Sequence, residues 1–212
     1  MKTLSRVAVF FAIASLFVAA QDTMKKSDDK KMAKKASDMP MGMPMPKPSP
    51  EMQKMSKMLV GTWTTSEMFE VSDMMPKGGK GSGMAVIKPG PGGLSLVEEY
   101  HSKGGLGAFS GHGVFWWDDQ AKGFKNIWCD VTTPTGCTVA KGVGNFDGDK
   151  LVFNDEQEMM GKNEMMQNVL TPEGSGITMV MSSGESAGAM KKMMTIKYSK
   201  PAAKKEATPA GQ

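Results

Sequence analysis

The sequence predicts an all-β protein, folded as an antiparallel up-and-down barrel of about ten strands with one short N-terminal helix. Three observations support this. Between Gly61 and Tyr198, short runs rich in aromatic and β-branched residues are separated by Gly, Pro and Asp. Polar and apolar residues alternate in many of these runs, as in strands with one buried face. Short links favour antiparallel neighbours, and closing the sheet removes its unpaired edges. A two-sheet sandwich is the alternative.

The helix is predicted over Glu51–Leu59. Its apolar residues, Met52, Met55, Met58 and Leu59, fall on one helical face. A helix at this position is expected to cap an open end of the barrel.

Turn residues set the strand boundaries. The run Pro89-Gly90-Pro91-Gly92-Gly93 is a strong break, and Asp147-Gly148 is a tight-turn signal. The Gly- and Lys-rich segment 76–83 is predicted to be a mobile turn. In the first strand, Trp63, Phe69 and Val71 are predicted to share one face. The predicted strands are Trp63–Val71, Met84–Lys88, Leu94–His101, Ala108–Asp118, Phe124–Val131, Thr138–Asn145, Leu151–Met159, Glu164–Leu170, Ile177–Met181 and Met193–Tyr198.

Residues 1–20 have the form of a secretory signal peptide. Lys2 and Arg6 precede an apolar stretch, and the small residue Ala20 precedes the expected cleavage point. An uncleaved anchor is the alternative. We therefore expect a periplasmic or extracellular protein, with no stable membrane insertion after signal cleavage.

Composition divides the rest of the chain into three parts. Residues 21–50 are rich in Lys, Met and Pro and contain no aromatic residue and no Leu, Ile or Val, so a disordered linker is predicted. Residues 51–199 have the size of one domain. Residues 200–212 are predicted to be a disordered tail.

The formal net charge is +4, but 51–199 holds 14 Lys against 17 Asp and Glu. Without a basic face, nucleic acid is not an expected partner.

The two cysteines, Cys129 and Cys137, are predicted to form a disulfide across a hairpin. Pro134 and Gly136 between them favour a chain reversal. In the chain-entropy model a bond that closes so short a loop stabilises the fold by roughly 2–3 kcal/mol. A redox-active pair is the alternative, although such pairs usually have Cys-x-x-Cys spacing at a helix start.

Several short motifs follow one another along residues 51–199. They are Leu59-Val60-Gly61-Thr62-Trp63, Gly90 to Leu94 leading to Glu98-Glu99-Tyr100, Gly111-His112-Gly113-Val114 with Trp117-Asp118, Ile127-Trp128-Cys129-Asp130, Asp147-Gly148 with Leu151, and Met193-Met194-Thr195-Ile196-Lys197-Tyr198. In this order they resemble an uncharacterised bacterial family of secreted proteins, a domain of unknown function with a lipocalin-like (calycin) barrel. The resemblance implies a fold and no established activity.

Distant barrel relatives of similar size bind haem through a histidine near the end of the barrel. This chain has only His101 and His112, and no position matches that ligand. No cofactor is predicted.

Aromatic side chains are the expected lining if the barrel holds a small molecule. The candidate pocket residues are Trp63, Tyr100, His112, Phe115, Trp117 and Trp128. His112 lies between two glycines that leave room for another group to approach, and by strand alternation it faces away from Phe115 and Trp117. The alternatives are core packing for the aromatic residues, with Trp63 closing the barrel floor, and a surface position for His112.

Three acidic residues, Glu98, Glu99 and Asp130, are candidates for a polar contact inside the barrel, with a solvated position as the alternative. The pattern does not decide which face of Leu94–His101 points inward.

Methionine is unusually frequent. Met39, Met41, Met43 and Met45 alternate with Pro and Gly in the linker, and thioethers are soft ligands that select Cu(I). A copper or silver site is one hypothesis, and a spacer that scavenges oxidants is the other. Other methionines fall in the last four strands, including Met159, Met160, Met165, Met166, Met179, Met181, Met193 and Met194. They are predicted to pack softly in the core or to line an adaptable cavity.

The leading functional hypothesis is a barrel that binds a small apolar or amphipathic molecule. The alternatives are a structural or stress-related envelope protein without a ligand, and soft-metal binding through the linker. An enzyme is not predicted, because no base, orienting acid and nucleophile are seen to converge. The sequence does not define an oligomeric state.

Overall fold

The computed structural model describes residues 45–72, 75–105, 107–159 and 162–202. The chain divides into two compact units, Met1–Met45 and Pro46–Gln212, and all elements described below belong to the second. The predicted signal peptide, most of the predicted linker and residues 203–212 of the predicted tail lie outside the described residues.

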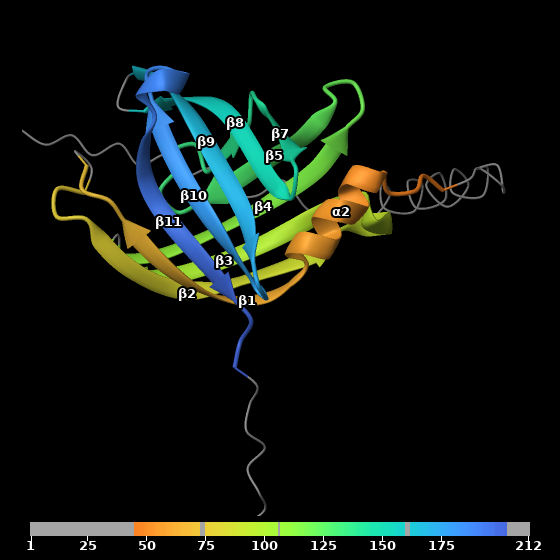
Figure 1. The fold of residues 1–212 in the computed structure, drawn as a ribbon, viewed down its shortest axis with the longest axis horizontal. Coiled ribbons are helices and arrows are strands. Elements are labelled where there is room, and N and C mark those ends of the chain that lie inside the picture. Colours follow the sequence, from red (N-terminus) through yellow and green to blue (C-terminus); the bar gives the residue numbers. More distant parts are fainter. Residues whose placement is uncertain (1–44, 73–74, 106, 160–161, 203–212) are drawn as a thin grey trace, which may run out of the picture. The chain divides into compact units, whose positions relative to one another are not determined.

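Within the described residues, eleven strands form one antiparallel sheet (Figure 1). The strands are β1 Gly61–Phe69, β2 Gly79–Pro89, β3 Ser95–Gly104, β4 Gly107–Asp118, β5 Gly123–Asp130, β6 Cys137–Val139, β7 Val143–Asp147, β8 Lys150–Met159, β9 Lys162–Glu173, β10 Gly176–Gly184 and β11 Lys191–Ser199. The sheet order is β4-β3-β2-β1-β11-β10-β9-β8-β7-β5-β6, and pairing of β4 with β5 closes it. Ten strands thus form a closed barrel, with β6 along the edge of β5, which confirms the predicted fold class over a sandwich.

The prediction of a turn over 76–83 is wrong in its second half, where β2 begins at Gly79. Glycine lacks a strand-forming side chain, so the pattern gave no strand signal there. The register pairs Gly81 with Glu67 of β1. A Cβ at Gly81 would collide with the Glu67 carboxylate, so glycine leaves the space that this carboxylate fills.

The predicted strand Thr138–Asn145 is interrupted and forms β6 and β7. Ile127 of β5 pairs with Val139, whereas Phe124 pairs with Gly144, so β6 and β7 together carry two more residues than β5 across this stretch. The extra residues are held by Asp155, whose Oδ1 accepts hydrogen bonds of 2.8 Å from the backbone N–H groups of 141 and 142. The tertiary partner that holds this bulge lies on β8, which local sequence does not reveal.

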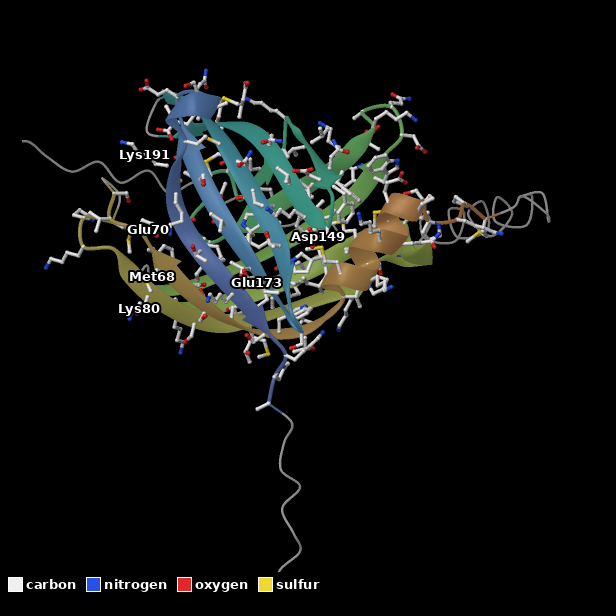
Figure 2. The ribbon with its side chains drawn as sticks, viewed as in Figure 1. Met68, Glu70, Lys80, Asp149, Glu173 and Lys191 are labelled. Atoms are coloured by element: carbon white, nitrogen blue, oxygen red, sulfur yellow. A yellow bond between two sulfur atoms is a disulfide. The ribbon has the colours of Figure 1, made fainter. Side chains whose placement is uncertain are left out.

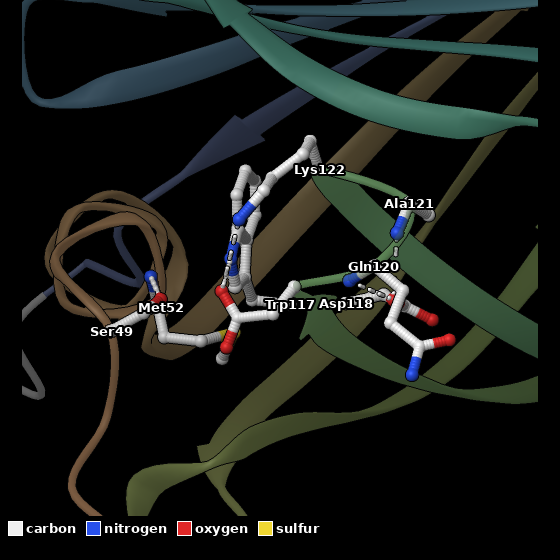
Figure 3. A network of polar contacts seen from close by, with 8 residues as sticks. Ser49, Met52, Trp117, Asp118, Gln120, Ala121 and Lys122 are labelled. Carbon is white, nitrogen blue, oxygen red and sulfur yellow. Dashed lines mark hydrogen bonds and ion pairs between the residues drawn. The ribbon is translucent and has the colours of Figure 1, made fainter.

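Helix α2, Pro50–Leu59, covers one end of the barrel as predicted. Ser49 caps it by accepting a hydrogen bond of 3.1 Å from the Met52 N–H (Figure 3). Its apolar face, including Met55 and Leu59, is buried. Lys54 on its outer side donates to the carbonyl of Gly148 at 2.8 Å. In the part of the chain that the structure describes, no helix has both the length and the apolar character needed to cross a bilayer.

An aromatic cluster fills the barrel beside the helix. Phe124 is fully buried, with ring centroids 5.2 Å from Trp117 and 5.8 Å from Phe146. Trp117 also donates its indole N–H to Asp119 at the β4–β5 turn, where the Asp118 carboxylate accepts two backbone N–H bonds (Figure 3). This packing closes one end of the barrel.

The outer surface is polar and carries scattered apolar side chains. Met68 and Lys80 point outward from neighbouring strands (Figure 2). Glu70 forms an ion pair of 2.7 Å with Lys192 of β11. Cys129 of β5 and Cys137 of β6 face each other in the register and are joined by a disulfide, which confirms the prediction.

Candidate functional site

The barrel encloses a cavity of about 380 Å³. It extends from the inner side of α2, where Met55 and Leu59 line it, to the opposite end, where Asp130 and Gln157 do. Volumes of this size are typical of small-molecule sites. The inward side chains of β1–β4 and of β9–β11 form two walls of different chemistry.

The first wall, which we call the acidic wall, consists of the inward residues of β1 to β4. Glu67 and Glu98 are its two carboxylates, and both are buried. The Tyr100 hydroxyl donates to Glu67 Oε1 at 2.5 Å and lies 3.4 Å from the Thr65 hydroxyl. This part of the barrel is therefore polar although it is removed from solvent.

Burial governs the protonation of these groups. Loss of hydration raises the pKa of Glu98 to about 7, because the charged form is disfavoured away from water. Burial also raises the pKa of Tyr100, helped by its hydrogen bond to Glu67. The pKa of Tyr198 is raised by burial and by the nearby charge of Glu98. Glu98 thus changes charge near neutral pH, and both tyrosines stay protonated there.

Glu98 is unpaired among the described residues. It is only 8% exposed, and no described group donates a hydrogen bond to its carboxylate or forms an ion pair with it. Two more polar groups that line the cavity share this property. The Ser102 hydroxyl has no partner within the described chain, and the buried Asn168 Oδ1 accepts no hydrogen bond there. Buried polar groups normally have partners, so Glu98 and Ser102 are available to a guest.

Glycines on β4 create the space behind the acidic wall. Gly113 stands opposite Glu98 in the register, and Gly111 stands opposite Tyr100. A Cβ at Gly111 or Gly113 would lie 2.7–2.8 Å from atoms of the Trp128 indole. The group for which these glycines leave room is therefore the Trp128 ring, which lies against β4 and lines the cavity. Its indole N–H donates to Asp130 at 3.0 Å.

The second wall, which we call the methionine wall, is formed by β9, β10 and β11. Its cavity-lining thioethers are Met166, Met179, Met181 and Met194. Leu170, Ile177 and Ile196 complete this apolar surface. Unbranched thioether side chains adapt to irregular shapes, so the methionine wall can adjust to a guest.

Two further carboxylates at the end away from α2 are already satisfied. Asp130 accepts hydrogen bonds from Thr132, Thr133 and Trp128. Burial acts to raise the pKa of Asp130, but its hydrogen bonds from the two threonines outweigh this and leave the pKa lowered. Asp155 is occupied by the bulge between β6 and β7. These two residues shape the barrel end, whereas Glu98 remains unpaired.

The structure separates the six candidate pocket residues. Tyr100, Phe115 and Trp128 line the cavity. Trp63 and Trp117 pack at the α2 end instead, with the Trp63 indole donating to the Leu59 carbonyl at 2.9 Å. The hypothesis that His112 contacts a guest needs correction.

His112 is exposed on the outer face of β4 and does not line the cavity. Strand alternation places it opposite Phe115 and Trp117, as the pattern indicated. The space that the flanking glycines leave is therefore on the inner face of β4, where the Trp128 ring lies, and not beside the histidine.

The sequence reasoning missed several inward polar residues. Thr65 and Glu67 follow Trp63 at the two-residue spacing of one strand face, so alternation alone could have placed them inside. Glu98 and Glu99 are both candidates for an inward polar contact from the sequence, and the structure places Glu98 inside the barrel and Glu99 outside. Ser102 and Asn168 carried no signal, because an isolated polar residue is equally common on an outer face.

The methionine hypothesis for the linker falls mostly outside the described residues. Met39, Met41 and Met43 are not described, and Met45 is exposed. Across the described ranges, no group of three or more His, Cys, Asp or Glu is arranged to hold a metal ion. Soft-metal binding by the linker stays a prediction.

These features define the class of protein, a closed antiparallel β-barrel with an internal cavity. The family model described as "Protein of unknown function (DUF1579)" matches residues 47–200, and the chain belongs to this family. No curated protein matches the chain. Among solved structures, Rv2717c from M. tuberculosis is similar with 11% identity and a TM-score of 0.51, over 73% of this chain and 99% of that one. That similarity concerns the fold.

Proposed function

We propose that this protein is a binding module that holds one small amphipathic molecule inside its barrel. The observation that carries the proposal is the cavity of about 380 Å³, with an acidic wall on one side and a methionine wall on the other. An apolar surface with a few placed polar groups is the usual composition of a small-molecule site.

The proposal assigns binding and no catalysis to the cavity. Ser110 and His112, a possible nucleophile and base two residues apart, lie on the face of β4 that is turned away from the cavity. The disulfide fits a periplasmic or extracellular location, because such bonds persist in oxidising compartments. A secreted carrier or scavenger of a small molecule is consistent with both features.

The proposal is tested with the neutral fluorescent dye Nile red and the full chain. Met179→Trp enlarges a side chain that lines the cavity, and we expect it to weaken dye binding at least tenfold. The matched control is Met68→Trp, which makes the same change on the outer surface, where Met68 is 44% exposed, and it should leave binding unchanged. Urea unfolding of each variant checks that it is folded.

Native mass spectrometry of the protein purified from its own host provides a second measurement. A discrete added mass that is reduced in the Met179→Trp variant supports the proposal. If wild-type protein shows neither added mass nor saturable dye binding, the proposal is wrong and the barrel is a ligand-free structural module.

A further inference from the structure

The charge inside the cavity is one-sided. Of the described residues that line it, four are acidic, namely Glu67, Glu98, Asp130 and Asp155, and none is Lys, Arg or His. The described ion pairs of the protein, such as Glu70 with Lys192, lie on its outer surface. Low-dielectric walls strengthen the field of interior charges, so the cavity favours cations and disfavours anions.

Within this set, Glu98 has no partner. Asp130 accepts several hydrogen bonds from the loop that follows it, Asp155 accepts two from the bulge between β6 and β7, and Glu67 accepts one from Tyr100. Glu98 is 92% buried and accepts none from any described group. An ionised carboxylate that is buried without a partner is costly, so a cation that reaches it is strongly favoured.

A further observation, independent of the acidic residues, points to a guest with hydrogen-bond donors. Ser102 is 8% exposed and lines the cavity, yet its hydroxyl has no described partner. A protonated primary amine carries three donors, which matches a set of unpaired acceptors.

The apolar part of such a guest also has a surface to contact. Met179, Met194 and Ile196 line the same cavity on the methionine wall. Tyr198, on the same strand as Met194 and Ile196, is close enough to Glu98 for the charge of that carboxylate to raise its pKa. The methionine wall and the unpaired carboxylate are therefore within reach of one small molecule.

From this juxtaposition we infer that the guest is an amphipathic amine, whose ammonium group pairs with the Glu98 carboxylate and whose hydrocarbon part packs on the methionine wall. This inference rests on the proposed binding function and names the chemical class of its ligand.

The pairing implies a pH dependence. The titratable groups near Glu98 are Glu67 from β1, Tyr198 from β11 and Tyr100 from its own strand. The inward residues of the flanking strands β2 and β4 are glycine, alanine, isoleucine or aromatic and do not titrate. Because burial raises the pKa of Glu98 to about 7, affinity for an ammonium group should rise from pH 6 to pH 8. Alkylammonium groups stay charged up to about pH 10.

The test compares three probes with the same chain and different head groups: n-octylamine, n-octanol and n-octanoate. Each displaces Nile red from the full chain at pH 8. We expect octylamine to bind at least tenfold more tightly than octanol, and octanoate to bind most weakly. Glu98→Gln should reduce the octylamine-to-octanol affinity ratio about tenfold while octanol binding is kept. Glu99→Gln, the same change on the outer face of the same strand, should leave the ratio unchanged.

Equal binding of octylamine and octanoate by the wild type overturns the inference. So does an unchanged ratio in Glu98→Gln. In either case, if octanol still binds and Met179→Trp still weakens it, the proposed function stands and only the ligand class is wrong. If none of the three probes displaces the dye, the inferred ligand class is wrong, whereas saturable dye binding still supports the proposed function. The wild-type ranking tests charge selection even if the variant does not fold.

Discussion

The two walls of the cavity are packed in different ways. On the acidic wall, glycines leave space for large inward side chains: Gly81 makes room for the Glu67 carboxylate, and Gly113 makes room for the Trp128 ring. On the methionine wall, no glycine is needed, because flexible side chains such as Met179 fill the available space. The acidic wall depends on glycines that leave space, and the methionine wall depends on flexible side chains that fill it.

This difference indicates which wall determines the specificity for a ligand. The positions of the carboxylates on the acidic wall are set by backbone register and by close contacts, so a guest must match them. The methionine wall can change rotamers and accept hydrocarbon groups of varied shape. We therefore expect substitutions on the acidic wall to have large effects and conservative substitutions on the methionine wall to have small ones.

The largest effect is expected from Glu98→Gln in the ligand-free protein. Because the folded-state pKa of Glu98 is raised from 4.5 to about 7, its contribution to stability is fully present below pH 4.5 and lost as pH rises through 7. At about 1.36 kcal/mol per pKa unit, the loss is on the order of 3 kcal/mol. Relative to wild type, the variant should gain that amount between pH 4 and pH 8, measured by urea unfolding.

Glu99→Gln is the control for this prediction, because Glu99 is exposed on the same strand. Its pH dependence should follow that of wild type. If Glu98→Gln shows the same pH dependence as wild type, Glu98 is solvated and the description of the acidic wall is wrong.

The next effect concerns the space left by glycine. In Gly113→Ala the added Cβ would lie 2.8 Å from Trp128 Cε3 and 3.0 Å from Phe115 Cε2. Overpacking of this kind costs about 1–3 kcal/mol, so the free energy of unfolding should fall by that amount. Because the indole must move, the tryptophan emission spectrum of the native state should also change.

Gly188→Ala is the matched control, since no atom lies within 4 Å of the Cβ that it adds. Its stability should stay within about 0.5 kcal/mol of wild type. Equal losses in the two variants would show that the cost is a general property of glycine replacement and not of the Trp128 contact.

The smallest effect is expected from Met179→Leu on the methionine wall. The two side chains have similar volumes, and such exchanges usually cost less than about 1.5 kcal/mol. The same urea unfolding assay should show an unchanged denaturant dependence, because the buried area is nearly the same. A loss above about 3 kcal/mol would mean that this wall is as tightly fitted as the acidic one, and would remove the contrast between them.

Particular residues show how far sequence reasoning reaches. Alternation correctly placed Phe115 and Trp117 opposite His112, because side chains in a strand point to alternate faces. The same rule extends from Trp63 to Thr65 and Glu67, which the structure places on the buried face of β1. The start of β2 was not predicted because Gly81 and Gly83 carry no side chain from which a pattern could be read.

The candidate site was predicted only in part. Tyr100 and Trp128 are large residues of the kind expected in a pocket, and they line the cavity. Trp63 and Trp117 are of the same kind but pack at the end covered by α2. Composition cannot separate these positions, because depth along the barrel axis depends on which strands pair and in what register.

The sequence by itself determined the all-β class, the capping helix and the disulfide, because turn residues, periodicity and cysteine spacing are local properties of the chain. Only the tertiary structure decided that Glu98 is buried without a partner and that Gly113 makes room for Trp128. Both depend on residues that lie far apart in the sequence and meet only when β4, β5 and their neighbours are paired. The physical reason is that burial and charge pairing are properties of the closed barrel, not of any one strand.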